Sequence, residues 1–163
     1  MTHSRRRSPR YRALAPSAAL LVLAGAGCSS GGAQPSVAVP TPSSSEAAGY
    51  CGKLHEELPE TVAGLERGDP SPDSDLTAGW GDGAIVLRCG VPRPPRMDDP
   101  QSRAVDADGV NWLLEQRDDA GPRFTTTYRK AYVEVTLGVE YAHDITPLSA
   151  FAVPVRKTVP DSL

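Results

Sequence analysis

The sequence lacks an apolar run of the roughly 20 residues that a membrane-spanning helix needs. Its longest run covers residues 13–26 and is interrupted by Pro16, Ser17 and Gly25. Aromatic residues make up only 6% of the chain, but charged residues contribute 23%, which argues against a fibrous or wholly disordered protein. The 163 residues are enough for one domain with a modest core.

Basic residues are scarce once the N-terminus is set aside. Residues 1–27 hold five of the 17 basic residues and no acidic one. The remainder carries 12 basic and 20 acidic residues, a net charge of −8. Nucleic-acid binding relies on the neutralisation of phosphates by basic residues. A chain this acidic is therefore a poor candidate for binding nucleic acid. The remainder also lacks the basic cluster that draws a protein to anionic lipid without an anchor.

Reactive motifs are absent as well. The chain has no Gly-x-Ser-x-Gly elbow and no phosphate-binding loop, and its cysteines do not have metal-site spacing. His55 and His143 are isolated, with no second ligand at metal spacing. The aspartates at 98, 99, 106 and 108 lack the EF-hand order, so a solvated acidic loop is favoured over a calcium site. We therefore expect no catalytic residue, cofactor or metal.

The N-terminus has three parts: arginines over residues 5–12, the apolar run, and small residues before Cys28. This order is typical of a secretory signal peptide, here residues 1–27. Ala26-Gly27-Cys28 resembles the lipobox of bacterial lipoproteins, in which the thiol receives diacylglycerol, although Gly25 stands where that pattern usually has an aliphatic residue. The alternatives are a signal peptide cut near Ala26, with Cys28 a spare thiol, and an uncleaved short anchor.

Lipidation of Cys28 would leave two cysteines, Cys51 and Cys89. Two cysteines outside the cytoplasm are expected to pair. The alternative is a pair of buried free thiols. A disulfide would place the protein outside the cytoplasm, where the lipid would anchor it to the outer face of the plasma membrane.

Residues 28–48 are predicted to be the lipidated cysteine and a disordered tether, because Ser, Gly and Pro dominate and no aromatic residue is present. Residues 49–160 are predicted to form a single α+β domain. Its expected sheet is antiparallel, with about four strands over residues 84–91, 110–115, 124–129 and 131–137. Helices are expected at both ends, from Glu46 and over 147–157; residues 64–78 are expected to form a loop.

One set of residues could present a ligand or partner surface. Trp80, in a Gly-rich turn, could stack on a sugar or peptide, but plugging the edge of a core is the favoured interpretation. The segment 124–130 could present hydroxyls and a cation, although Thr and Tyr are also what strands prefer. The candidates are Trp80, Arg88, Tyr128, Arg129 and Tyr132.

Two segments carry a resemblance to a known family. They are Leu54-His-Glu-Glu-Leu-Pro59 after Cys51, and Leu76-Thr-Ala-Gly-Trp-Gly-Asp-Gly-Ala-Ile-Val-Leu-Arg-Cys-Gly-Val-Pro92. With Gly109-Val-Asn-Trp112 and the stretch 129–135, they resemble the actinobacterial domain of unknown function 3515 family over about residues 50–159. The resemblance implies exported lipoproteins with a cysteine pair, and it implies no activity.

These patterns favour a non-catalytic envelope lipoprotein that binds a partner, such as another envelope protein. The alternative is a module that binds a small ligand or assists an envelope enzyme. An open pocket holding Trp80, Arg88 and Arg129 would favour the ligand module. A buried Trp80 beside a flat surface would favour the partner. The oligomeric state does not follow from the sequence.

Overall fold

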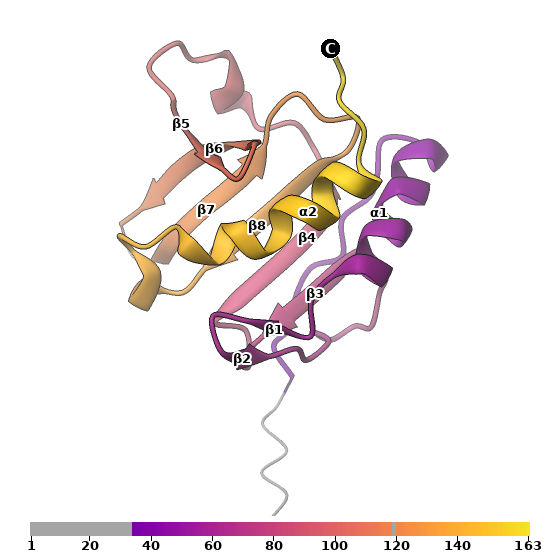
Figure 1. Cartoon of the computed structure of the whole chain (residues 1–163), viewed down its shortest axis with the longest axis vertical. Coiled ribbons are helices and arrows are strands. Elements are labelled where there is room, and N and C mark those ends of the chain that lie inside the picture. Colours follow the sequence, from indigo (N-terminus) through magenta and orange to yellow (C-terminus); the bar gives the residue numbers. More distant parts are fainter. Residues whose placement is uncertain (1–33, 119) are drawn as a thin grey trace, which may run out of the picture. The chain divides into compact units, whose positions relative to one another are not determined.

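The computed structural model describes residues 34–118 and 120–163 (Figure 1). The predicted signal peptide and Cys28 lie outside the described residues. Eight strands and two α-helices are seen in the described part. The helices are α1 Ser45–Glu57 and α2 Ser149–Thr158, and short 3₁₀ helices are η1 Pro95–Asp98, η2 Val139–Tyr141 and η3 Thr146–Leu148. The strands are β1 Thr61–Val62, β2 Leu65–Glu66, β3 Thr77–Trp80, β4 Ile85–Val91, β5 Arg103–Ala107, β6 Val110–Arg117, β7 Ala120–Thr126 and β8 Tyr132–Leu137.

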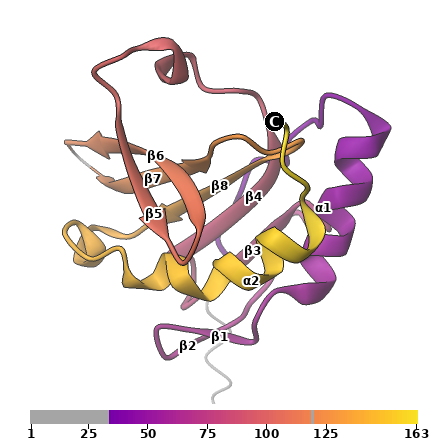
Figure 2. The ribbon, with the colours of Figure 1, turned by 45° about the horizontal axis from the view of Figure 1, so that its top comes forward.

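The main sheet has six strands in the order β3-β4-β8-β7-β6-β5, and every pairing is antiparallel. Strands β1 and β2 form a separate hairpin. The fold is therefore α+β with an antiparallel sheet, as predicted. Both helices lie on one face of the main sheet, side by side (Figure 2). We call this the helix face and the opposite one the open face.

Helix α1 begins where the sequence supplies a cap. The Ser44 hydroxyl accepts a hydrogen bond from the Ala47 amide at 3.0 Å, and Glu46 lies in the first turn, where a negative charge is favourable. Cys51 and Leu54 point to the sheet and are buried. The helix ends before Leu58, because the following proline disfavours helical geometry at the residue preceding it.

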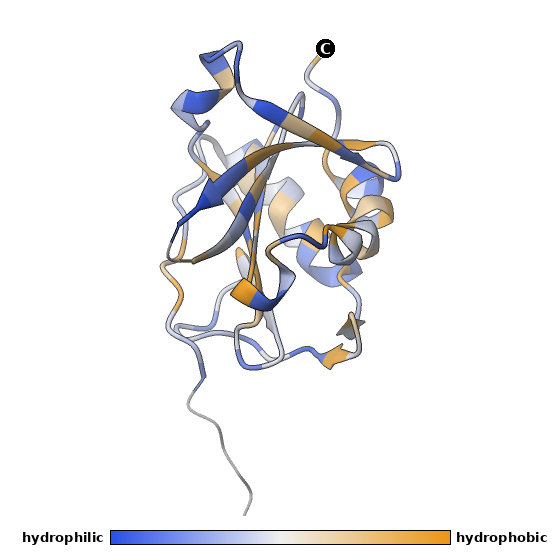
Figure 3. Ribbon diagram, turned by 90° about the vertical axis from the view of Figure 1, so that its left-hand side faces the viewer, coloured by the Kyte–Doolittle hydropathy of each residue, from blue (hydrophilic) through white to orange (hydrophobic). Residues whose placement is uncertain are grey.

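The core forms on the helix face because side chains alternate along each strand. Leu87, Val135, Phe124 and Leu114 lie in register across four neighbouring strands, and all four are buried. Both hydrophobic and hydrophilic residues occur along the strands in Figure 3. Helix α2 tolerates Pro154, which removes one backbone donor, because Phe151 and Val155 pack into this core.

The expectation of about four strands was wrong. Strand β3 lies at the end of the expected loop 64–78, and all four of its residues are buried, so its sequence shows no alternation. Strand β5 follows a proline-rich stretch and is mostly exposed, so it has little apolar signal. The segment expected at 124–129 is displaced: β7 begins at Ala120 and ends at Thr126, which leaves Tyr128 in a connection.

The second half of the segment 28–48, which the sequence predicts to be a disordered tether, is ordered in the structure. Residues 35–42, which we call the strap, lie against the domain. The Val37 amide donates to the Ser71 carbonyl at 2.9 Å, and the Ser71 amide donates to the Pro35 carbonyl at 3.0 Å. Pro40 is buried. The strap is thus held by specific contacts that composition alone does not reveal.

Candidate functional site

The disulfide between Cys51 and Cys89 is present and joins α1 to β4. Their Cα atoms are 5.5 Å apart, and both residues are almost fully buried in the core. The alternative of two free thiols is therefore wrong. The bond is structural, because burial removes both sulfurs from solvent.

Trp80 does not belong to an accessible surface. Its side chain is 0% exposed, its ring lies tilted 5.1 Å from that of Phe151, and its indole N–H donates to the Pro59 carbonyl at 3.0 Å. The hypothesis that it stacks on a sugar or peptide does not survive this burial. Trp80 fills the edge of the core, and the Gly-rich turn beside it accommodates the Leu65 side chain against Gly81.

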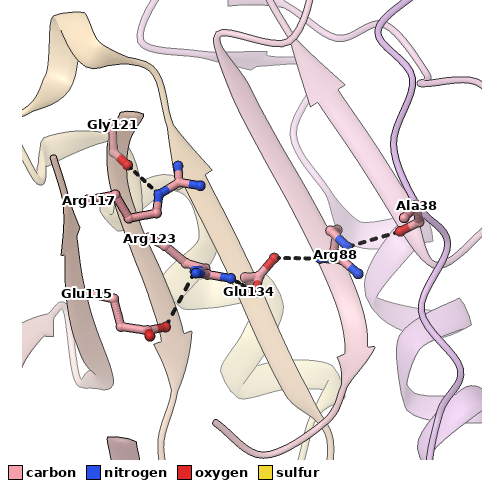
Figure 4. Close-up of polar contacts among 7 residues, drawn as sticks. All are labelled: Ala38, Arg88, Glu115, Arg117, Gly121, Arg123 and Glu134. Carbon is pink, nitrogen blue, oxygen red and sulfur yellow. Dashed lines mark hydrogen bonds and ion pairs between the residues drawn. The ribbon is translucent and has the colours of Figure 1, made fainter. Parts of the chain in front are cut away.

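Arg88 lies on the open face, in a row of alternating charges (Figure 4). It donates through Nη1 to Glu134 at 3.0 Å and through Nε to the Ala38 carbonyl at 3.0 Å. The other carboxylate oxygen of Glu134 lies 3.6 Å from Arg123, whose Nε lies 3.4 Å from Glu115. We call Arg88, Glu134, Arg123 and Glu115 the ion ladder.

The charged groups of the ion ladder pair with one another. Glu134 is 7% exposed, and two guanidinium groups compensate its buried charge. Arg88 holds both this carboxylate, through Nη1, and the strap, through Nε. Nearby, the Nε of Arg117 donates to the Gly121 carbonyl at 2.9 Å. The ion ladder is a device of the fold and ties the strap to the sheet.

Arg129 is likewise held internally. It is 8% exposed and donates to the Val159 carbonyl at 3.0 Å, while Asp161 lies 3.1 Å away. The neighbouring backbone pairs with the C-terminal residues: the Lys130 amide donates to Pro160, and the Ser162 amide donates to Tyr128. Arg129 therefore fastens the C-terminal segment to the connection between β7 and β8.

Tyr128 is the exception among the candidates. Its exposed fraction is 58%, and its φ of 57° lies in the left-handed region, which costs a non-glycine residue about 1–2 kcal/mol. The hydrogen bond from Ser162 to its carbonyl fixes this conformation. An aromatic ring held at the surface on a strained backbone is a feature that binding sites often share.

Two hollows flank Tyr128, and Thr127 and Tyr128 line both of them. The first has a volume of about 280 Å³ and lies between the connection 92–102 and the open face; the second has a volume of about 450 Å³. The first is also lined by Arg93, Met97, Asp99, Ser102, Arg103, Ala104, Leu113, Tyr132 and Ser162. The second is also lined by Gly109, Asn111, Arg129, Arg156, Asp161 and Leu163. We call Tyr128 with its two hollows the Tyr128 site.

The cations of the first hollow differ in availability. Arg93 lies 2.8 Å from Asp98; this hydrogen bond lowers the pKa of the Asp98 carboxyl below its ordinary value and raises the pKa of Arg93. Arg103 is exposed and makes no ion pair with any described residue. The structure therefore brings Tyr128 and Tyr132 together with arginines that sequence reasoning missed. Neither Trp80 nor Arg88 lines either hollow.

Within residues 34–118 and 120–163, no three His, Cys, Asp or Glu residues gather as metal ligands. His55 Nε2 lies 2.8 Å from Arg67, and a guanidinium can only donate, so this nitrogen accepts. Asp106 accepts from the Gly109 amide and Asp99 from the Gln101 amide. These aspartates serve the turns that contain them.

The fold and the Tyr128 site define a small, disulfide-linked α+β domain with a polar surface site. The chain belongs to the family described as protein of unknown function (DUF3515), whose model matches residues 13–163. No curated protein and no solved structure matches the chain. None of the helices in the described part has the length and apolarity needed to cross a membrane.

Proposed function

We propose that this protein is exported, anchored through a lipid on Cys28 to the outer face of the plasma membrane, and binds a protein partner there through the Tyr128 site. Three features support the export half of the proposal. They are the signal-like order of residues 1–27, the small residues before Cys28, and a buried disulfide of the kind that persists outside the cytoplasm.

The single observation that carries the binding half is the presentation of Tyr128. Tyrosine and arginine dominate the binding energy of many protein interfaces, because they combine a large apolar surface with polar tips. Tyr128 projects between two hollows, and the exposed Arg103 borders one of them. The burial of Trp80 further favours a partner over a ligand stacked on that ring.

The partner surface that fits this chemistry carries carboxylates. Arg103 lines the first hollow without an ion pair to any described residue, whereas Arg93 is paired with Asp98 and the chain after residue 27 has a net charge of −8. An available cation on an acidic protein favours a carboxylate on the partner. A small anionic ligand in the 280 Å³ hollow is the second candidate, because Arg103 lines this hollow and makes no ion pair with any described residue.

Anchoring is tested by growing the host with a labelled fatty acid. The wild-type chain should carry the label and sediment with membranes, and Cys28→Ser should do neither. An unlabelled wild-type chain would refute the anchor.

Binding is tested by placing a photo-crosslinking residue at Tyr128 in intact cells. Val153 is the matched control, because it is 63% exposed on α2. A discrete adduct from position 128 that is absent from position 153, and that Arg103→Glu abolishes, supports the proposal. Equal adducts from both positions, or none from position 128, would contradict it.

A further inference from the structure

The strap runs beside β4 along its whole length. At one end Pro35 lies on Gly83: a Cβ built there would be 2.9 Å from the proline Cβ. In the middle the Ala38 carbonyl accepts from Arg88 Nε at 3.0 Å. At the other end Pro42 lies on Gly90, where a Cβ would be 2.8 Å from the proline Cγ. The strap is therefore held beside β4 at three points, in addition to its two hydrogen bonds with Ser71.

These contacts shorten the free tether. Without the strap, a tether of 20 residues could extend to about 70 Å. With the strap fixed from Pro35, only seven residue steps separate it from Cys28, which can span at most about 25 Å. This bound follows from covalent geometry alone and applies to any conformation of those residues.

The strap also decides which end of the domain lies near the anchor. Pro35 lies at Gly83, and the Ala84 carbonyl accepts from the Gly138 amide just beyond the end of β8. Tyr132 begins β8 at its opposite end, about 17–20 Å away at the rise of a strand. Figure 1 shows the strap entering at the end that carries β1 and β2, with the C-terminus at the other end.

We propose, on the basis of the lipid anchor proposed above, that the strap holds the β1–β2 end within about 25 Å of the bilayer and directs the Tyr128 site away from it. The orientation rests on the place where the strap leaves the domain and on the reach of the tether. Glu66, Asp69 and Asp82 are exposed at this end, and the chain after residue 27 carries −8 in total, so anionic headgroups do not attract this end and the covalent tether must hold it near the bilayer.

The test uses residues 28–163 with the disulfide intact, so that Cys28 is the only free thiol. The thiol is coupled to a maleimide lipid in phosphatidylcholine–phosphatidylglycerol vesicles that contain an acceptor fluorophore. A coumarin amino acid replaces either Asp82 or Tyr128 as the donor. The two positions are matched, because both are exposed and both have positive φ, at 53° and 57°.

Energy transfer from position 82 should exceed that from position 128 at least about twofold, because the strands separate them by about 20 Å. Equal transfer, or stronger transfer from position 128, would overturn the orientation. Inserting ten Gly/Ser residues before residue 34 should reduce transfer from position 82, because the r.m.s. tether length rises about 1.5-fold. An unchanged value would contradict the short tether. Chemical coupling supplies the anchor here, so a failure of lipidation in cells is detected only by the fatty-acid experiment.

Discussion

Pro42 packs on Gly90 so closely that a Cβ on the glycine would lie 2.8 Å from the proline ring. Gly90 has a φ of 88°, and the register between β4 and β8 shifts between Cys89 and Val91. The irregularity thus opens a place on the open face for the proline. Because Gly90 also follows a disulfide cysteine, one short segment of β4 fixes both α1 and the strap.

Gly90→Ala should destabilise the fold more than Gly64→Ala does. Both glycines have positive φ, at 88° and 79°, so alanine is strained at either position. Only Gly90 has a neighbour, since nothing lies within 4 Å of a Cβ at Gly64. The difference in free energy of unfolding, measured by urea denaturation, should be about 1–3 kcal/mol. Equal losses would mean that Pro42 does not pack there in solution.

Removing the disulfide should lower stability without changing the fold. The bond closes a loop with a sequence separation of 38, for which the chain-entropy model gives about 4 kcal/mol. The double variant Cys51→Ala/Cys89→Ala should therefore unfold at lower urea than the oxidised protein. Wild type treated with reductant is the control and should unfold at similar urea. If the oxidised and the reduced protein unfolded at the same urea concentration, the disulfide would not stabilise the fold.

The class of fold could be predicted from the sequence, because apolar and polar residues alternate clearly along a strand that buries only one of its faces. Val133, Val135 and Leu137 alternate with Tyr132 and Thr136, and β8 lies where the pattern placed a strand. Strand β3 could not be predicted this way, because it is buried on both faces. The strap was missed for a different reason: its contacts are two hydrogen bonds with the Ser71 backbone, two prolines packed on glycines and one carbonyl that accepts from Arg88, which composition does not encode.

The candidate site was predicted only in part. Tyr128 was chosen because the segment 124–130 could present hydroxyls and a cation, Tyr132 was chosen with it, and both line the first hollow. Arg93 and Arg103 were missed, since each lies in or beside a proline-rich stretch with no periodic signal. Arg88 and Arg129 were chosen for their charge, which the structure uses in internal ion pairs. Sequence shows that an arginine is present but not whether its charge is already paired.

Because of its place in the ion ladder, Glu134→Gln should lower the free energy of unfolding more than Glu115→Gln does. Glu134 lies between two arginines with its side chain 9% exposed, whereas Glu115 contacts one and is 17% exposed. Neutralising Glu134 leaves Arg88 and Arg123 facing each other, at a cost of about 2 kcal/mol after allowing for their partial exposure. Urea denaturation of both variants measures the difference. An equal loss in both would show that the second arginine adds nothing.

The pair of Asp98 and Arg93 should be visible in an acid titration. Its hydrogen bond lowers the pKa of Asp98 in the folded state below the ordinary value of 3.8. The associated stability is thus fully present above about pH 3.8 and is lost as pH falls through the lower, folded-state pKa. NMR should show that Arg93→Gln raises the pKa of Asp98. Asp144, whose pKa is lowered by Thr146, is the internal control and should not move. An equal change in the pKa of both carboxyls would show that Arg93→Gln acts on the whole protein and not through its contact with Asp98.

The two tryptophans should respond differently to replacement by phenylalanine. Both are 0% exposed, but Trp80 donates to Pro59, whereas Trp112 Nε1 is buried without a hydrogen-bond partner among the described residues. Trp80→Phe therefore leaves a carbonyl unpaired in addition to a cavity, at a cost of about 1–3 kcal/mol for the carbonyl. Trp112→Phe forms a similar cavity but removes a donor that had no partner, which offsets part of the loss. Thermal and urea unfolding should place Trp80→Phe below Trp112→Phe in stability. The reverse order would mean that the indole of Trp80 is not held by Pro59.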